Sequence, residues 1–396
     1  MDTPGPLYPS TYAATQRIIL DRSARLGIVG LDYVGLDLAI SFSHAGFVVD
    51  GFDADPGRVA MLRSRKSYLS RISSAQIMEA TNRGFQARED LSRLSEADVI
   101  ILCIRPELDK DRHADWRSLR QTTFEVAEFL RAGQLVVVES TAYPGPAEQI
   151  VMPILEKANS AHVRVSRDTG MWDEIFLAIS PGRIGPLRTA QAATKLPKFI
   201  AGIDHFSVAL AAELYGTCSA PLLIVSSAST AELIDVFKSA YKTVNTALTN
   251  ELKQVCLRMG IDQWEVIEAV SACLCGTQVF YAGPGLRVSH IPLDSCSMSR
   301  KARSVGVSAR LVELADDINR MMPDFLVRHT GNALKELGEG IKGSQILVLG
   351  VASEKNADDL LGLPSLTLIE LLRSVEALVI TPAFLSRFWS AEAKRI

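Results

Sequence analysis

The stretch Leu26-Gly-Ile-Val-Gly-Leu-Asp-Tyr-Val-Gly35 decides the fold of the first half of this 396-residue chain. Its apolar opening ends in a glycine and leads directly into a helical pattern. This predicts a buried strand, a tight turn and a helix over Val34–Ala45. A second apolar run, Phe47–Asp53, predicts the next strand. Such a strand–turn–helix–strand unit favours phosphate binding, because the turn brings backbone amides to the N-terminus of the helix.

The same alternation of strand and helix continues along the chain. Further apolar strands are predicted at Val99–Cys103, Leu135–Glu139, Phe176–Ile179, Phe199–Ala201 and Leu222–Val225. Alternation of this kind predicts a parallel sheet that is covered by helices on both faces. The fold class is therefore α/β, with an N-terminal Rossmann-like doubly wound sheet over residues 24–228.

The pattern changes after residue 228. A long helix is predicted at Ser229–Met259, with Ser229 or Thr230 as its N-cap and Gly260 as its end, and another helix begins at Asp262. A strand at Ile346–Gly350 and a helix around Ser365–Ser374 begin a second, smaller Rossmann-like domain. We thus predict four segments, namely an N-terminal extension (1–23), the first Rossmann-like domain (24–228), a central helical domain (229–340) and the C-terminal domain (341–396).

Composition excludes several classes of protein. Hydrophobic residues make up 47% of the chain and charged residues 22%, which is typical of a globular protein. The net charge of −3 gives no electrostatic reason to expect nucleic acid or an anionic membrane as partner. No segment resembles a signal peptide or a membrane span, so a cytoplasmic location is expected. The six cysteines lack the paired spacing of a zinc site, and we expect no metal.

Eight segments decide which family the chain resembles, namely Leu26–Gly35, Gly51–Pro56, Glu139–Gly145, Ser180–Arg183, Ala231–Glu232, Asn250–Glu251, Gly283–Asp294 and Leu347–Asp359. In this order they resemble the UDP-glucose/GDP-mannose dehydrogenase family. Members of that family use NAD to oxidise C6 of a nucleotide-linked sugar to the acid, through a thioester on a cysteine. The resemblance implies that residues 24–228 are an NAD-binding-type domain. It also implies a shortened UDP-binding-type domain at 341–396 and a homodimer through the helix at 229–259.

The cofactor site departs from the family pattern. Its three glycine positions read Gly30, Asp32 and Gly35, so a carboxylate stands where a pyrophosphate should approach the backbone. Asp53, at the end of the second strand, suits a ribose 2′-OH and favours NAD over NADP. Arg105 follows the fourth strand and is predicted to pair with Asp32, although the two changes could be independent. We therefore expect impaired NAD binding and assign no cofactor.

The catalytic positions have changed as well. Counting back four residues from Asp294 puts His290 at the family's cysteine, which removes the thioester route. The family's oxyanion-stabilising lysine and asparagine become Asp235 and Ser239, so a cation is replaced by an anion. Thr141 and Asp294 are retained, either as functional residues or as residues that only support the fold.

Further substrate-site positions differ too. The family's S-P-E-R glutamate is Gly182, although Arg183 is retained, and the substrate-binding arginine is Leu361. Cys296 lies just beyond Asp294 and is a poor substitute for the missing nucleophile.

Three functions fit this pattern, and enzymatic activity stays uncertain. The first is a non-redox enzyme of a specialised biosynthetic pathway, with His290 and nearby carboxylates as acid–base groups. The second is a non-catalytic binding or scaffold partner, and the third is an active NAD-dependent nucleotide-sugar 6-dehydrogenase. The expected partners are a small-molecule ligand in the cleft between domains and a second copy of the chain, with neither nucleic acid nor membrane.

Overall fold

The computed structural model divides into two compact units, Met1–Val236 and Phe237–Ile396, which are described separately. It describes residues 10–104, 106–108, 114–139, 145–159, 161–167, 173–181, 197–218, 221–273, 280–285, 294–349 and 363–381.

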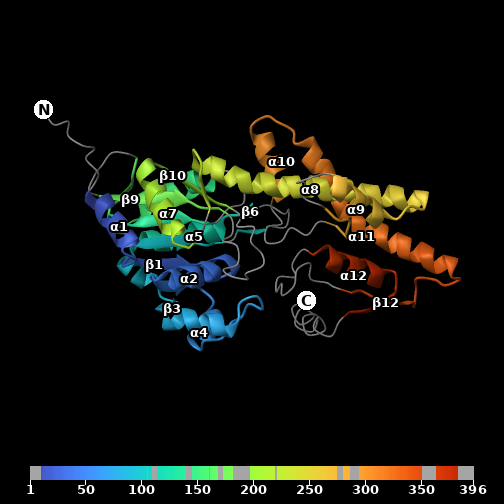
Figure 1. Cartoon of the computed structure of the whole chain (residues 1–396), viewed down its shortest axis with the longest axis horizontal. Helices are drawn as coiled ribbons and strands as arrows, with labels where there is room; N and C mark the ends of the chain where they lie inside the picture. Colours follow the sequence, from blue (N-terminus) through green and yellow to red (C-terminus); the bar gives the residue numbers. More distant parts are fainter. Residues whose placement is uncertain are drawn as a thin grey trace. The chain divides into compact units, whose positions relative to one another are not determined.

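The first unit is a doubly wound α/β domain, as the sequence predicted (Figure 1). Within the described residues its main sheet has nine strands, in the order β11-β10-β9-β7-β4-β1-β2-β3, with β8 paired to β9. Every pair is parallel except β9 with β10. The strands are β1 (Arg25–Val29), β2 (Val48–Phe52), β3 (Phe85–Arg88), β4 (Val99–Leu102), β7 (Leu135–Val138), β8 (Arg164–Val165), β9 (Glu174–Ile179), β10 (Lys198–Gly202) and β11 (Leu222–Ile224).

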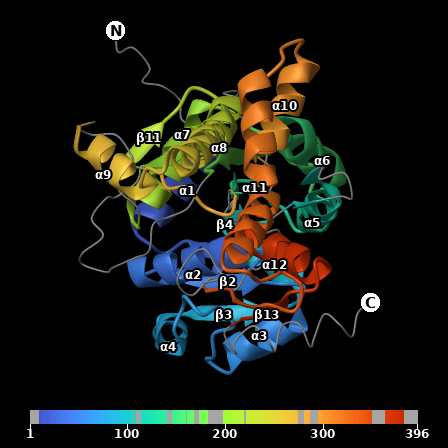
Figure 2. The same cartoon turned by 90° about the vertical axis from the view of Figure 1, so that its right-hand side faces the viewer.

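Helices cover both faces of this sheet (Figure 2). Strands β4, β7 and β9 are buried along their entire length, so their apolar runs are continuous rather than alternating. One face packs against α1 (Ser10–Leu20), α2 (Tyr33–Ala45), α3 (Pro56–Arg63), α4 (Ser74–Asn82) and α7 (His205–Gly216). The other packs against η1 (Leu91–Glu96), α5 (Arg117–Ala127), η2 (Ala147–Val151) and α6 (Met152–Ala158). A short antiparallel pair, β5 (Glu107–Leu108) and β6 (Ala114–Asp115), completes the unit.

The N-terminal segment differs from the expected extension. Residues 10–20 form α1, and its Tyr12 and Ile19 are buried in the core of the first unit. The Tyr12 ring lies 4.9 Å from that of Phe206 on α7. The weak periodicity of this stretch hid a helix that is held in place by a few large side chains.

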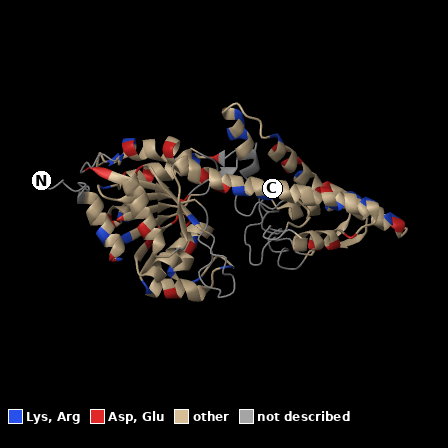
Figure 3. Ribbon diagram, turned by 45° about the horizontal axis from the view of Figure 1, so that its top comes forward, with Lys and Arg blue, Asp and Glu red and all other residues tan. Residues whose placement is uncertain are grey.

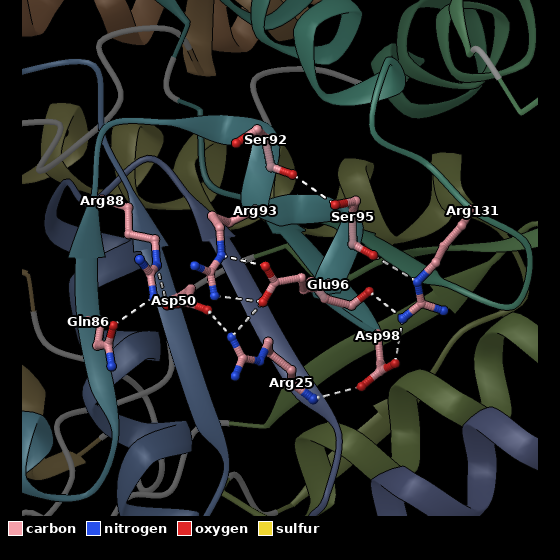
Figure 4. Close-up of polar contacts among 11 residues, drawn as sticks. Arg25, Asp50, Gln86, Arg88, Ser92, Arg93, Ser95, Glu96, Asp98 and Arg131 are labelled. Atoms are coloured by element: carbon pink, nitrogen blue, oxygen red, sulfur yellow. Dashed lines mark hydrogen bonds and ion pairs between the residues drawn. The ribbon is translucent and has the colours of Figure 1, made fainter.

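The edge of the sheet at the amino ends of β1 and β4 is held by paired charges (Figure 4). Asp50 is buried on β2 and accepts from Arg25 Nη1 at 3.1 Å and Arg88 Nε at 2.5 Å. Arg131 Nη2 donates to Asp98 Oδ1 at 2.6 Å and to the carbonyl of Ala97. Because each of these arginines already has carboxylate partners, this edge stabilises the fold and offers no spare cation to a ligand.

The second unit is mainly helical. A long helix, α8, starts in the first unit, and Thr230 N donates to Ser227 Oγ at 3.1 Å, so the cap lies before the predicted Ser229. Gly260, with a φ of 67°, ends this helix as predicted. Basic and acidic residues are interspersed along both units (Figure 3). The remaining elements are α8 (Ala228–Met259), α9 (Gln263–Cys273), α10 (Asp294–Ser304), α11 (Arg310–Glu336), α12 (Pro364–Ser374) and a parallel pair of strands, β12 (Gln345–Leu347) and β13 (Leu378–Ile380).

No helix among the described residues combines the length and the apolar character that crossing a membrane requires.

Candidate functional site

The carboxyl ends of four neighbouring strands bring Gly30, Cys103, Glu139 and Ser180 into one row. Backbone bonds from Cys103 N to Val29 O and from Glu139 N to Leu102 O fix this row, and Ser180 N bonds in the same way to Val138 O. Open α/β sheets bind their ligands at this edge, outside the carboxyl ends of the strands. We therefore take this row as the candidate site of the first unit.

The turn after β1 depends on its glycines. Gly30 has a φ of +91°, a backbone conformation that residues other than glycine rarely adopt. A Cβ placed on Gly35 would lie 1.8 Å from the carbonyl oxygen of Gly30. The first and third glycine positions of the fingerprint are therefore fixed by backbone geometry, whether or not a ligand binds.

Asp32 is the N-cap of α2. Its Oδ1 accepts from Val34 N at 3.1 Å and from Gly35 N at 3.5 Å. These amides are the donors that a helix N-terminus offers to a bound anion, and here the chain's own carboxylate takes them. The pyrophosphate of NAD therefore does not fit this turn as it stands. The predicted partner, Arg105, lies outside the described residues.

Asp53 follows β2 and faces the same turn. Its Oδ2 accepts from Leu31 N at 2.9 Å, its Oδ1 accepts from Asp55 N at 2.9 Å, and Arg58 Nη1 lies 3.4 Å from Oδ2. The side chain is only 8% exposed. Asp53 thus lies where a ribose-binding carboxylate should be, but its present bonds are to the protein itself.

A buried group of charges lies beneath the same row, and the sequence did not predict it. Lys198 Nζ donates to Glu139 Oε2 at 2.7 Å and to Ser180 O at 2.8 Å. The Tyr215 hydroxyl donates to the other oxygen of Glu139. The Lys198 and Glu139 side chains are each 1% exposed. The only hint in the sequence is a lysine at the start of an otherwise apolar strand.

Burial dominates the electrostatics of this group. It raises the pKa of Glu139 above its ordinary value, although the neighbouring Lys198 opposes the shift. Burial also raises the pKa of the Cys103 thiol, which makes it a poor nucleophile, and raises the pKa of Cys218 to about 12. Asp235 contributes further to the raised pKa of Glu139, so this predicted residue acts electrostatically on the row.

The predicted catalytic residues are only partly described. Asp235 and Ser239 both lie on α8, four residues apart and so on one face of the helix. Asp294 is the first residue of α10, but its side chain lies outside the described part. His290 and Thr141 lie outside the described residues too, as do Gly182, Arg183 and Leu361.

The loop that leads toward His290 is anchored in the second unit. Asn250 Oδ1 accepts from Gly283 N at 3.0 Å, and Asn250 Nδ2 donates to Asn319 Oδ1 at 2.9 Å. A Cβ on Gly285 would lie 2.9 Å from Asn319 O, so the backbone approaches α11 closely there. These contacts fix the start of the loop at 283–285.

Residues 145–147, which follow the segment with Thr141 in the chain, are anchored to α8 in the first unit. Glu232 is buried on α8 and accepts from Gly145 N at 2.6 Å and from Ala147 N at 3.2 Å.

Among the described residues, no group of three or more His, Cys, Asp or Glu side chains is arranged to hold a metal ion.

Fold and site together define a Rossmann-type domain of the dinucleotide-binding class, followed by a helical domain. The sequence profile of the "UDP-glucose/GDP-mannose dehydrogenase family, NAD binding domain" matches residues 24–219. The profile of the same family's central domain matches residues 229–321. The chain belongs to the UDP-glucose/GDP-mannose dehydrogenase family.

Similar proteins cover most of the chain. A UDP-N-acetyl-D-glucosamine 6-dehydrogenase of Pseudomonas aeruginosa is 28% identical over 343 residues, which are 86% of this chain and 78% of the relative. A UDP-N-acetyl-D-mannosamine dehydrogenase of Methanocaldococcus jannaschii is 26% identical, over 85% of this chain and 73% of the relative. The solved structure of a UDP-D-ManNAc dehydrogenase from Pyrococcus horikoshii superimposes with a TM-score of 0.80 at 25% identity, over 90% of this chain and 82% of that one.

Proposed function

We propose that this chain is a repurposed nucleotide-sugar dehydrogenase homologue that does not carry out NAD-dependent oxidation at C6. The observation that carries the proposal is the carboxylate of Asp32, which caps α2 and takes the amides of Val34 and Gly35. In a dinucleotide-binding domain those amides would face the cofactor's pyrophosphate.

The size of the repulsion between the Asp32 carboxylate and a bound pyrophosphate supports the proposed exclusion of NAD. Two unit negative charges about 4 Å apart repel by about 4 kcal/mol at an effective dielectric constant of 20. Since each 1.4 kcal/mol is tenfold in affinity, that repulsion alone weakens binding roughly a thousandfold. Bonds to the two amides are lost in addition, unless Asp32 leaves its capping position.

Non-redox chemistry is the form of activity that we propose for this chain. His290 lies four residues before Asp294 in the chain, and with Asp235 and Ser239 on α8 these side chains form a set suited to moving a proton and not to forming a thioester. Thr141 belongs to the same proposed set. This part of the proposal rests on the sequence, and it suits a proton transfer or an elimination in a specialised biosynthetic pathway.

We propose that the partner of this chain is a second copy of itself. Such self-association also suits a non-catalytic scaffold. The part of α8 in the second unit carries large apolar side chains that are 47–65% exposed, at spacings of four or seven residues. Such spacing places them along one side of the helix. A second copy would cover Tyr241, Leu248, Val255 and Met259. Leu248→Glu should then halve the mass measured by light scattering, whereas Leu337→Glu, at an exposed site beyond α11, should leave it unchanged.

The deciding experiment is a calorimetric titration of the wild type with NADH, alongside Asp32→Gly. We expect no measurable binding to the wild type and a gain of affinity in the variant. Tight binding by the wild type would refute the closed cofactor site and make NAD either structural or part of a chemistry that does not need the cysteine. NADH production from UDP-N-acetylhexosamines would show an active dehydrogenase and refute the proposal.

Enzyme and scaffold are then separated by two further variants. In an enzyme, His290→Ala and Asp235→Asn should lose turnover of a ligand identified by binding screens while the melting temperature stays the same. A scaffold should tolerate both changes without loss of its association.

A further inference from the structure

The small parallel sheet of the second unit is covered by a helix on one face only. Buried and exposed positions alternate along β12 and β13, so each strand turns one side toward solvent. On the covered face, Val348 and Val379 pack against Leu363 and Ile369, which belong to α12 and its N-cap (Figure 1). Parallel sheets are normally buried on both faces. The second face of this sheet therefore lacks a cover among the described residues.

The uncovered face is apolar. The register of the two strands pairs Leu347 with Ile380 and Gln345 with Leu378, and these paired residues lie on the same face. Leu347 and Leu378 are each 56% exposed, and Ile380 is 48% exposed. Large apolar side chains that adjoin one another on an exposed face indicate a surface that another segment or molecule covers.

The size of this face favours a segment of the same chain over a second copy. Stable interfaces between proteins use about 20–30 residues on each side. Leu347, Leu378 and Ile380 are far too few for such an interface. A segment of the same chain needs less contact, because its tether presents it at an effective concentration of about a millimolar and no translational freedom is lost when it docks.

We propose that residues 382–396 dock on the uncovered face of β12 and β13 with their large apolar side chains. This segment lies outside the described residues and begins two positions after Ile380, the end of β13. Its large apolar side chains form two pairs with a spacing of four residues, which is typical of one side of a helix. They are Phe384, Leu385, Phe388 and Trp389.

The length of the segment suits this face. A helix formed by residues 382–396, at 1.5 Å per residue, would be about 22 Å long, whereas a three-residue strand such as β12 is about 10 Å long. The segment can therefore extend along the whole of the face. The inference is independent of the proposed function, since neither β12 nor β13 belongs to the row of residues around Asp32.

Hydrogen exchange of the full chain tests the docking. Two amides report on the sheet, because Leu378 N donates to Ser344 O and Val348 N donates to Ile380 O across the two strands. In Trp389→Asp both amides should exchange at least tenfold faster, while those of β1 in the first unit stay unchanged. Ser390→Asp is the matched control, because it adds the same charge one residue further on, away from the apolar side, and should change neither amide.

Fluorescence supplies a readout of the segment itself. The emission of Trp389, obtained as the difference between the wild type and Trp389→Phe, should lie at shorter wavelength than that of a solvated indole. Ile380→Asp places a charge on the face and should shift this emission to longer wavelength. In the Ile380→Asp background, Trp389→Asp should not speed exchange further, because the contact between the two residues is already lost.

Three outcomes would overturn the docking. The first is equal exchange in the wild type and Trp389→Asp, and the second is an equal effect of Ser390→Asp. The third is protection of β12 and β13 that rises with protein concentration, which would assign the face to a second copy. None of these results concerns NADH binding, so the proposed function would stand in each case.

Discussion

Lys198→Met removes the cation of the buried pair and keeps most of the side-chain volume. It takes away the Glu139–Lys198 bond of 2.7 Å and the Ser180 bond of 2.8 Å, and leaves Glu139 with Tyr215 alone. A carboxylate buried in this way takes up a proton instead of staying charged. Protonation of Glu139 limits the loss of folding free energy to 1.36 kcal/mol for each pH unit above the ordinary carboxyl pKa of 4.5. At pH 7 the loss is therefore at most about 3.4 kcal/mol.

The native protein already bears part of this penalty, because burial raises the pKa of Glu139 even beside Lys198. We therefore expect the variant to lose between about 2 and 3.4 kcal/mol at pH 7. In the variant, the pKa of Glu139 is higher in the folded state than in the unfolded state. The variant is therefore most stable below pH 4.5 and loses stability as the pH rises. At pH 5.5 the loss should shrink to at most about 1.4 kcal/mol.

Hydrogen exchange of peptides from β7 and β9 measures this loss within the first unit, even if the two units unfold separately. Exchange at pH 7 should be about thirty to three hundred times faster than in the wild type. Glu139→Gln/Lys198→Met removes both charges and should return to within about 1 kcal/mol of the wild type. A single variant that exchanges like the wild type, or a loss that does not change between pH 5.5 and 7, would refute the reasoning.

Three further predictions concern other contacts. Asp32→Ala should lower the free energy of unfolding by about 1 kcal/mol because it removes the cap of α2, whereas Asp32→Asn, which keeps an oxygen acceptor, should change it by a few tenths in urea titrations. Gly35→Ala should prevent soluble expression, because the new Cβ would overlap Gly30 O; a folded variant would show that the turn can move. Asn319→Ala leaves the amide of Asn250 without its partner and should destabilise α11 by about 1–3 kcal/mol, which faster hydrogen exchange there would reveal.

The main sheet could be predicted from the sequence because its strands are buried on both faces. Leu26–Gly30, Val99–Cys103 and Leu135–Glu139 were predicted within one residue of β1, β4 and β7, since a short uninterrupted apolar run between turn residues favours a fully buried strand. The long helix α8 was predicted equally well from its length and its terminal glycine. Helix α1 was missed, because its stability comes from Tyr12 and Ile19 in the core and not from a local pattern.

The site was harder to predict, because its chemistry depends on contacts distant in sequence. Lys198 and Glu139 are 59 positions apart in the chain. No spacing rule connects such residues. Asp32 is different, because an aspartate just before a helix is a common N-cap. We predicted that its charge would repel a cofactor and that it would pair with Arg105. We did not predict its bonds to the helix, although the local signal for them was in the sequence.

Asp32 can also be regarded as a ligand that is never free to diffuse away. Its carboxylate is attached two residues from Val34 N, so it competes for that amide as a tethered group. Even flexible tethers present a group at an effective concentration of about a millimolar, and this one is short and rigid. Raising the concentration of a dissolved phosphate compound is therefore a weak way to vacate the helix end, and a change of residue 32 is a strong one.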